Sequence, residues 1–316
     1  MKTSPVAFLF PGQGSQAVGM GRHVAETFSQ ARDVFRESDE VLGFSLSSLC
    51  FEGPEEKLRL TEMTQPAILV TSIACERVLR FKGLAPAWVA GHSLGEYSAL
   101  VSAGSLRLSD ALRLVRRRGC FMQEAVPVGQ GAMAAILGLP PEAVESLCRE
   151  EARGEVLAAA NYNSPEQTVI AGTATAVERA VQAAPGRGAK RAIPLPVSAP
   201  FHCELMAPAR ERLRPDLEST QFRDLNCPLV SNVDARPVTS GTRARENLIR
   251  QITAPVLWEA SLREMAAAGV RCFVEVGPGR VLSGLLRRIL PDAQGLNVED
   301  PASLERTLRR LEEETG

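Results

Sequence analysis

The sequence predicts an α/β protein with a parallel main sheet and a smaller subdomain inserted into it. Two patterns predict this class. Short apolar runs alternate with amphipathic helical stretches near both ends of the chain, and a strand–helix–strand–strand–helix–strand order occurs in the middle. The length of 316 residues allows one large domain or two coupled ones.

The first part of the chain predicts strands that are followed by helices. Val6 to Phe10 has the composition of a buried strand that ends at a turn over residues 11–14, and a second apolar run covers residues 87–90. Helical periodicity is present over residues 24–39, 65–81 and 96–103. Strand, sharp turn and helix in that order is the α/β arrangement.

Between about Gly131 and Leu195 the pattern changes to that of a ferredoxin-like unit. The expected elements are a strand over 132–137, a helix after Pro141, strands over 156–160 and 168–171, a helix over 174–184 and a strand over 191–196. This βαββαβ order is the split-βαβ, ferredoxin-like pattern. We therefore predict a main domain of residues 1–128 and 198–316 and a ferredoxin-like subdomain of residues 129–197.

The α/β pattern returns after the inserted unit. Residues 272–276 predict a strand that ends at Gly277-Pro278-Gly279. The tail after Pro301 predicts a charged amphipathic helix with one solvated face. These elements complete the main domain.

Composition does not favour a protein that binds nucleic acid or a membrane surface, or one that is held together by zinc or disulfides. The 36 basic and 37 acidic residues leave a net charge of -1, which does not favour binding to nucleic acid or to a membrane surface. The 7 cysteines are widely spaced without a C-x-x-C pair, so we expect neither a zinc site nor a disulfide framework. No apolar run has the length of a signal-peptide core or a membrane span, and we expect a cytoplasmic protein.

A serine lies in a G-x-S-x-G motif at residues 91–95, directly after an apolar run and directly before a predicted helix. In nucleophile elbows this motif places the serine on a sharp strand-to-helix turn. The turn also puts Ser93 close to a helix N-terminus, whose free N–H groups stabilise an oxyanion. Ser93 is therefore a candidate nucleophile, and the alternative is a glycine-rich turn whose serine caps the helix.

A serine hydroxyl needs a base, and the chain has 3 histidines. His23 lies in a polar stretch and is expected at the surface. His92 is adjacent to Ser93, and neighbours on a sharp turn point apart, so His202, in the loop after the insert, is the candidate base. The alternative is a hydrogen-bonded structural histidine. Because no aspartate between Ser93 and His202 suits the third place of a triad, a backbone carbonyl could orient the imidazole.

One arginine lies on the apolar side of a predicted helix over residues 109–126. At about 100° per residue, Arg118 falls beside Met122, whereas three other arginines of this helix project to the opposite side. A buried guanidinium needs an internal carboxylate or a ligand anion as its partner. Beside an acyl-transfer serine, the ligand interpretation predicts an acyl group that carries its own carboxylate. The alternative is a structural ion pair.

Ordered sequence blocks extend along almost the whole chain, which is far more specific than one G-x-S-x-G motif. They are Phe10-Pro11-Gly12-Gln13-Gly14-Ser15-Gln16, Thr64-Gln65-Pro66-Ala67, Gly91-His92-Ser93-Leu94-Gly95-Glu96-Tyr97, Arg118 with Met122-Gln123, Gly131-Ala132-Met133-Ala134, Asn161-Tyr162-Asn163-Ser164-Pro165, the His202 loop, Ser231-Asn232-Val233 and Glu275-Val276-Gly277-Pro278-Gly279. With these blocks the chain resembles the bacterial malonyl-CoA:acyl carrier protein transacylase family. It is also similar to the acyltransferase domains of polyketide synthases.

The resemblance implies an α/β-hydrolase-like catalytic domain and a ping-pong malonyl transfer. The malonyl group would pass from malonyl-CoA to the phosphopantetheine thiol of acyl carrier protein, through an ester on Ser93, for fatty acid synthesis. His202 would be the base, and Arg118 would bind the free carboxylate of the malonyl group. No metal or bound cofactor is implied, because malonyl-CoA is the substrate and the carrier brings the phosphopantetheine.

The resemblance also implies roles for the residues around the reaction. The backbone N–H groups of Gln13 and Leu94 would form the oxyanion hole, and the backbone carbonyl of Gln251 would orient the histidine. The implied substrate-binding residues are Arg118, Gln65, His92, Asn161, Asn163 and Phe201. In polyketide acyltransferases, phenylalanine before the histidine accompanies malonyl and serine accompanies methylmalonyl, since the ring of Phe201 would crowd an α-methyl group.

Other functions fit parts of the sequence. A serine esterase of the α/β-hydrolase type would share the elbow but needs an acidic triad member, and a non-catalytic module could keep the fold while it docks carrier proteins. Within the family, the carrier could belong to a polyketide pathway served in trans. Lys190 and Arg191 are candidates for carrier docking, although a solvated face is the more ordinary interpretation of each. We expect a monomer.

Overall fold

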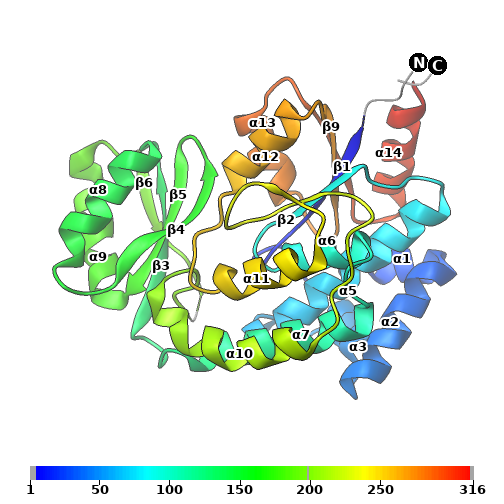
Figure 1. The fold of residues 1–316 in the computed structure, drawn as a ribbon, viewed down its shortest axis with the longest axis horizontal. Helices are drawn as coiled ribbons and strands as arrows, with labels where there is room; N and C mark the ends of the chain where they lie inside the picture. Colours follow the sequence, from blue (N-terminus) through cyan, green and yellow to red (C-terminus); the bar gives the residue numbers. More distant parts are fainter. Residues whose placement is uncertain (1–4, 198, 314–316) are drawn as a thin grey trace.

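Two sheets organise residues 5–197 and 199–313, which the computed structural model describes. A six-stranded sheet lies inside a layer of helices, and a four-stranded sheet with two helices stands beside it (Figure 1). The fold is therefore mixed α/β, as the sequence predicts. Residues 1, 198 and 316, which bound the predicted domains, lie outside the described residues.

The main sheet has the strand order β10-β9-β1-β2-β7-β8. Its strands are β1 (Val6–Phe10), β2 (Trp88–Gly91), β7 (Leu229–Val230), β8 (Pro237–Val238), β9 (Cys272–Val276) and β10 (Gln294–Val298). All neighbouring pairs are parallel except β7 and β8, which form an antiparallel hairpin. The sheet is therefore mostly parallel, as the sequence predicts, and it departs from the prediction at this edge, because residues 231–236 are too few for the crossover that a parallel pair requires.

Strand β1 has helices on both of its faces, and its side chains alternate between two cores. Phe8 and Phe10 pack into the core with α5 (Thr61–Phe81) and α7 (Leu108–Glu124), whereas Ala7 and Leu9 pack with α12 (Trp258–Ala267) and α13 (Val281–Ile289). The helices of the main unit are α1 (Arg22–Thr27), α2 (Ser29–Leu42), α3 (Leu46–Glu52), α4 (Glu55–Leu58), α5 (Thr61–Phe81), α6 (Gly95–Ser102), α7 (Leu108–Glu124), α10 (Ala207–Ser219), α11 (Gly241–Gln251), α12 (Trp258–Ala267), α13 (Val281–Ile289) and α14 (Pro301–Glu313). A short 3-10 turn, η2 (Glu204–Met206), precedes α10.

The stretch that predicts one helix over residues 24–39 forms two helices, α1 and α2. The chain is extended at Phe28, with φ -122° and ψ 126°, and this residue separates them. The Arg32 guanidinium donates to the carbonyls of Ala25 and Glu26, so it satisfies acceptors that the end of α1 exposes. Periodicity does not reveal such a break, because both helices present the same apolar face.

Helix α5 begins at Thr61, four positions before the predicted start, and Pro66 lies inside it. Proline has no N–H, so the carbonyl of Glu62 loses its partner within the helix. The Arg116 side chain donates to that carbonyl at 2.9 Å. This hydrogen bond from α7 explains how α5 continues through the proline.

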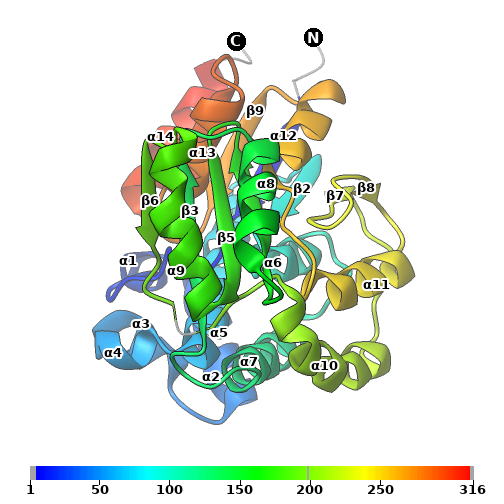
Figure 2. The same cartoon turned by 90° about the vertical axis from the view of Figure 1, so that its left-hand side faces the viewer.

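The small sheet has the strand order β4-β5-β3-β6 and is antiparallel. Its elements follow the βαββαβ order that the sequence predicts. They are β3 (Gly131–Leu137), α8 (Pro141–Ala152), β4 (Leu157–Ser164), β5 (Gln167–Thr173), α9 (Ala174–Ala183), a 3-10 turn η1 (Ala184–Arg187) and β6 (Arg191–Pro194). Figure 2 shows α8 and α9 on one face of this sheet, where their apolar side chains form a separate core.

Strand β4 extends beyond its predicted end at residue 160 and joins the two units. Backbone hydrogen bonds run from Val256 N–H to Ala160 and from Tyr162 N–H to the Val256 carbonyl, at 2.9 Å each. Asn161 and Asn163 therefore lie in a strand that contacts the main unit. Among the described residues, no helix combines the length and the apolar character that crossing a bilayer demands.

We expect Gly119→Ala to destabilise the protein by about 1–3 kcal/mol, because a Cβ there would lie 2.6 Å from Glu62 Cα, where α7 packs on α5. Gly284→Ala is the matched control within a helix. A Cβ at this position meets no other atom within 4 Å, so this variant should gain about 0.5–1 kcal/mol. Urea unfolding of both variants measures the two free energies, and equal effects would contradict the packing argument.

Candidate active site

Ser93 lies on the sharp turn between β2 and α6, with a backbone φ of 52°. The glycines of the motif are required by close packing. A Cβ on Gly91 would lie 1.8 Å from the Gly95 carbonyl carbon, and one on Gly95 would lie 2.1 Å from the Phe10 carbonyl oxygen. The strained serine and the two closely packed glycines are features of a nucleophile elbow.

The structure places His202 beside this serine. Its Nε2 lies 2.7 Å from Ser93 Oγ, and its Nδ1 lies 2.9 Å from the Gln251 carbonyl oxygen. His202 also has a left-handed φ of 60° in the loop before η2. With Nδ1–H donating to a carbonyl, Nε2 is left as the acceptor for the serine proton.

Two environmental effects keep the His202 ring neutral. The pKa of His202 is lowered to about 3, first by burial and then by the positive charge of Arg118, whereas the hydrogen bond to Gln251 acts in the opposite direction. The neutral imidazole is the form that accepts a proton. His202 is therefore able to act as a base at neutral pH.

Arg118 is 2% exposed and points from α7 toward the serine. Its Nη2 donates to Ser93 Oγ at 3.1 Å and to Gln251 Oε1 at 2.9 Å, and its Nη1 donates to Gln65 Oε1 at 2.9 Å. Its Nε has no hydrogen-bond partner among the described residues, and no described carboxylate lies within ion-pair distance of the guanidinium. The guanidinium is thus hydrogen-bonded by neutral oxygens, and the buried Glu96 carboxylate acts on its charge without contacting it directly.

The turn over residues 11–14 packs directly against the elbow. The His92 N–H donates to the Phe10 carbonyl at 3.0 Å, and a Cβ on Gly12 would lie 2.4 Å from the His92 carbonyl oxygen. Neither the Gln13 N–H nor the Leu94 N–H has a hydrogen-bond acceptor within the part of the chain that the structure describes. Both amides are therefore available to an oxygen of a ligand.

The other expected substrate-binding residues occupy positions around this centre. His92 contacts Asn163, with its Nε2 2.8 Å from Asn163 Oδ1. Asn161 and Asn163 are 6% and 8% exposed, and Phe201 is 8% exposed beside His202. His23, in contrast, is exposed and lies 3.3 Å from Glu26.

Asn232 belongs to this site, but its role could not be read from the sequence. Its Oδ1 accepts the Ser93 N–H at 2.8 Å, and its Nδ2 donates to the Gly91 carbonyl at 2.7 Å. These two bonds hold both sides of the elbow. Because the Ser93 N–H is used in this way, it is not available to an oxyanion. The Ser231-Asn232-Val233 block was the only sequence signal that could have pointed to this residue.

Glu96 is a second group that the sequence analysis left without a role. It is 1% exposed, and its Oε2 accepts from Gln251 Nε2 at 2.8 Å and from the Asn232 N–H at 3.2 Å. Its pKa is raised to about 7, because the effect of burial outweighs the opposing effect of the hydrogen bond from Gln251. Gln251 therefore joins Glu96 on one side to Arg118 on the other, and its backbone carbonyl holds His202.

Comparisons with known proteins agree with this arrangement. The model of the acyl transferase domain family matches residues 7–310. The malonyl CoA-acyl carrier protein transacylase of Bacillus subtilis (strain 168) is 48% identical over 312 residues, which is 98% of each chain. The chain belongs to the malonyl CoA-acyl carrier protein transacylase family.

Solved structures of this family have the same fold. The acyl carrier protein S-malonyltransferase of Vibrio cholerae O1 is 48% identical, with a TM-score of 0.94, over 96% of this chain and all of the other. A malonyl-transacylase solved in complex with a type II PKS acyl-carrier protein is 47% identical, with a TM-score of 0.95, over 97% of this chain and all of the other. The resemblance stated from the sequence is therefore confirmed.

The two expected docking candidates lie where β6 begins, Lys190 directly before the strand and Arg191 as its first residue. Lys190 forms an ion pair with Glu166 at 2.9 Å, and both side chains are exposed. Arg191 is exposed at the start of β6. The ion pair favours the solvated-face interpretation for Lys190.

We expect the His202 ring to stay neutral from about pH 8 to about pH 5, because its pKa lies near about 3. The nitrogen chemical shifts of 15N-labelled histidine measure the protonation of each ring. The variants His23→Asn and His92→Asn assign the signals of the other two rings. Arg118→Ala should raise the pKa of His202, since a positive charge is removed, although burial still holds it below its ordinary value. Protonation of this ring between about pH 6 and 7 in the wild type would contradict the argument.

Proposed function

We propose that this chain transfers a malonyl group from malonyl-CoA to the phosphopantetheine thiol of acyl carrier protein, through an ester on Ser93. The observation that carries the proposal is the Arg118 guanidinium. It lies 3.1 Å from Ser93 Oγ and has no described carboxylate partner, so it suits an acyl group that brings its own carboxylate. The names of the curated relatives describe the same reaction.

In the first half-reaction, Ser93 Oγ attacks the thioester carbonyl of malonyl-CoA. The proton of the hydroxyl passes to His202 Nε2, 2.7 Å away. The oxyanion of the tetrahedral intermediate accepts hydrogen bonds from the Gln13 and Leu94 N–H groups. The C–S bond then breaks, and the leaving thiolate takes the proton back from His202.

The second half-reaction reverses these steps with a different thiol. The phosphopantetheine thiol of the carrier gives its proton to His202 and attacks the carbonyl carbon of the ester. The bond from that carbon to Ser93 Oγ breaks, and the proton on His202 returns to the serine oxygen. This scheme uses side chains and backbone amides, and it routes no step through a metal or a bound cofactor.

Binding of the malonyl carboxylate also tunes the base. Arg118 contributes to the low pKa of His202, so a carboxylate that pairs with the guanidinium offsets part of this effect. The imidazole then becomes a stronger base only when an acidic acyl group is in place. Gln65 orients the guanidinium through its Oε1, and the buried ring of Phe201 limits the room for an α-branched acyl group.

The remaining finer assignments are part of this proposal. We assign residues 1–128 and 198–316 to an α/β-hydrolase-like catalytic domain and residues 129–197 to a ferredoxin-like subdomain, supported by the elbow and the βαββαβ order. Asn161, Asn163 and His92 border the substrate between them. A cytoplasmic location and a monomeric state stay predictions from the sequence.

Two versions of the function differ in the acyl carrier protein that accepts the malonyl group. Fatty acid synthesis is the favoured one, as the resemblance of the sequence to the bacterial transacylase family implies. A polyketide carrier served in trans is the second candidate, because one similar transacylase was solved with a type II PKS acyl-carrier protein. An ordinary serine esterase is disfavoured by the backbone carbonyl in the place of its acidic residue.

Arg118→Ala is expected to lower kcat/KM for malonyl-CoA by about 100-fold or more, because the charge-assisted hydrogen bonds to the carboxylate are lost (about 3 kcal/mol). Transfer of an acetyl group, which has no carboxylate, should fall by less than about tenfold. Steady-state rates with both acyl-CoA substrates give the comparison. Equal losses on the two substrates would exclude the proposed role of Arg118.

Intact-protein mass spectrometry after addition of malonyl-CoA should show one malonyl adduct on the wild type and none on Ser93→Ala. Addition of acyl carrier protein should remove the adduct and produce malonyl-carrier, since the ester is an intermediate of the ping-pong scheme. His202→Ala should form the adduct more slowly by about 100-fold or more. Loss of the adduct to water as fast as to the carrier would favour the esterase.

A further inference from the structure

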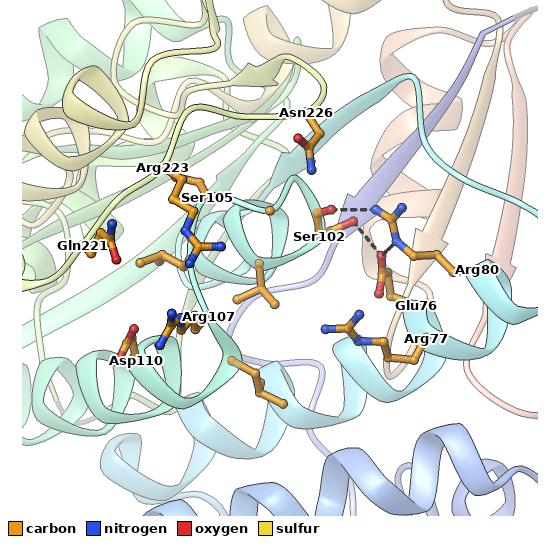
Figure 3. A pocket seen from close by; sticks show the side chains of 14 residues that line it. Glu76, Arg77, Arg80, Ser102, Ser105, Arg107, Asp110, Gln221, Arg223 and Asn226 are labelled. Carbon is orange, nitrogen blue, oxygen red and sulfur yellow. Dashed lines mark hydrogen bonds and ion pairs between the residues drawn. The ribbon is translucent and has the colours of Figure 1, made fainter.

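A second polar pocket of about 340 Å³ lies at the far ends of the helices that build the active site. It is formed by the end of α5, the end of α6 with the loop that follows, the first turn of α7 and the segment after α10 (Figure 3). Ser93 precedes the opposite end of α6, so the pocket is separate from the catalytic centre. The proposed function assigns no role to it.

The lining of this pocket is rich in positive charge. Arg77, Arg80, Arg107 and Arg223 line it, against the two carboxylates of Glu76 and Asp110. The chain as a whole has a net charge of -1, so this surplus is local. Such a concentration of guanidinium groups in a recess attracts anions.

Both carboxylates of the lining already have partners. Glu76 pairs with Arg80, and its Oε1 also accepts from Ser102 Oγ at 3.1 Å. Asp110 lies 3.5 Å from Arg113, which does not line the pocket. The acidic groups therefore do not neutralise the other arginines of the pocket.

Three arginines remain without a partner. Arg77, Arg107 and Arg223 are exposed, and none makes a side-chain hydrogen bond or ion pair with a described residue. Figure 3 shows the Arg77 side chain on one side of the view and those of Arg107 and Arg223 on the other. They come from three separate segments of the chain, so their convergence on one recess is a product of the fold.

Two further sets of unused donors line the same recess. The Ser105 hydroxyl is buried, with the residue 1% exposed, and has no hydrogen-bond partner among the described residues. Helix α7 begins at Leu108 without a side-chain cap, so the N–H groups of its first turn have no partner within the helix. A helix N-terminus of this kind favours an anion.

We propose that this pocket binds a small ligand that carries a phosphate group. A phosphate presents oxygens in several directions, which suits guanidinium groups from three segments together with a hydroxyl and the amides of a helix N-terminus. The volume is in the range of small-molecule sites. Val101, Leu106 and Leu108 give the recess an apolar wall for the organic part of such a ligand.

Isothermal titration calorimetry at constant ionic strength tests the proposal with pyrophosphate and adenosine 5′-monophosphate as probes. The double variant Arg107→Gln/Arg223→Gln should bind the tighter probe at least tenfold more weakly than the wild type. The control double variant Arg191→Gln/Arg306→Gln removes the same charge from exposed positions outside the pocket. Its affinity for the probe should stay within twofold of the wild-type value. Equal weakening in both double variants, or no binding to the wild type, overturns the proposal.

A further comparison excludes the catalytic centre as the site of binding. Arg118→Ala should bind the probe as the wild type does, because Arg118 does not line this pocket. Arg107→Gln/Arg223→Gln should keep the malonyl-transfer rate of the wild type in phosphate-free buffer, which also shows that it is folded. Loss of probe binding in Arg118→Ala would assign the binding to the active site and overturn the inference.

Discussion

The burial of Arg118 without a directly paired carboxylate is the constraint on which the rest of the site depends. Removal of a guanidinium from water is costly, and an internal ion pair is the usual way to offset this cost. Here the offset comes from oxygens of Gln65, Gln251 and Ser93. These hydrogen bonds hold the side chain and leave its charge for an acyl carboxylate. The same charge contributes to the low pKa of His202, so substrate recognition and base strength share one group.

Gln251 connects the parts of the site that must act together. Its carbonyl accepts from His202, its Oε1 accepts from Arg118, and its Nε2 donates to Glu96 and to the Ser93 carbonyl. One residue at the end of α11 thereby fixes the base, the carboxylate-binding group and the elbow. Asn232 adds the bonds to the elbow backbone that hold the strained serine in place.

Part of the fold and of the site could be predicted because it depends on local sequence. Gly91 of the G-x-S-x-G motif reports a close backbone approach within five residues, and helical periodicity alone places Arg118 on the buried face of α7. The βαββαβ order follows from the alternation of strand and helix patterns. The structure departs from the prediction at two places, a break at Phe28 within the helix expected over residues 24–39 and an antiparallel hairpin at β8 in the otherwise parallel sheet, and periodicity encodes neither.

The sequence by itself determined the family, the elbow and the one arginine that faces the core, since motif spacing and helical period are properties of neighbouring residues. Only the tertiary structure decided that Arg118 lacks a carboxylate partner. Its hydrogen-bond acceptors Gln65 and Gln251 are 53 and 133 positions away from it in the sequence. The bonds of Asn232 to the elbow span 139 and 141 positions. No local pattern specifies such contacts, because they form only when β2, α7, α11 and the loop after β7 pack together.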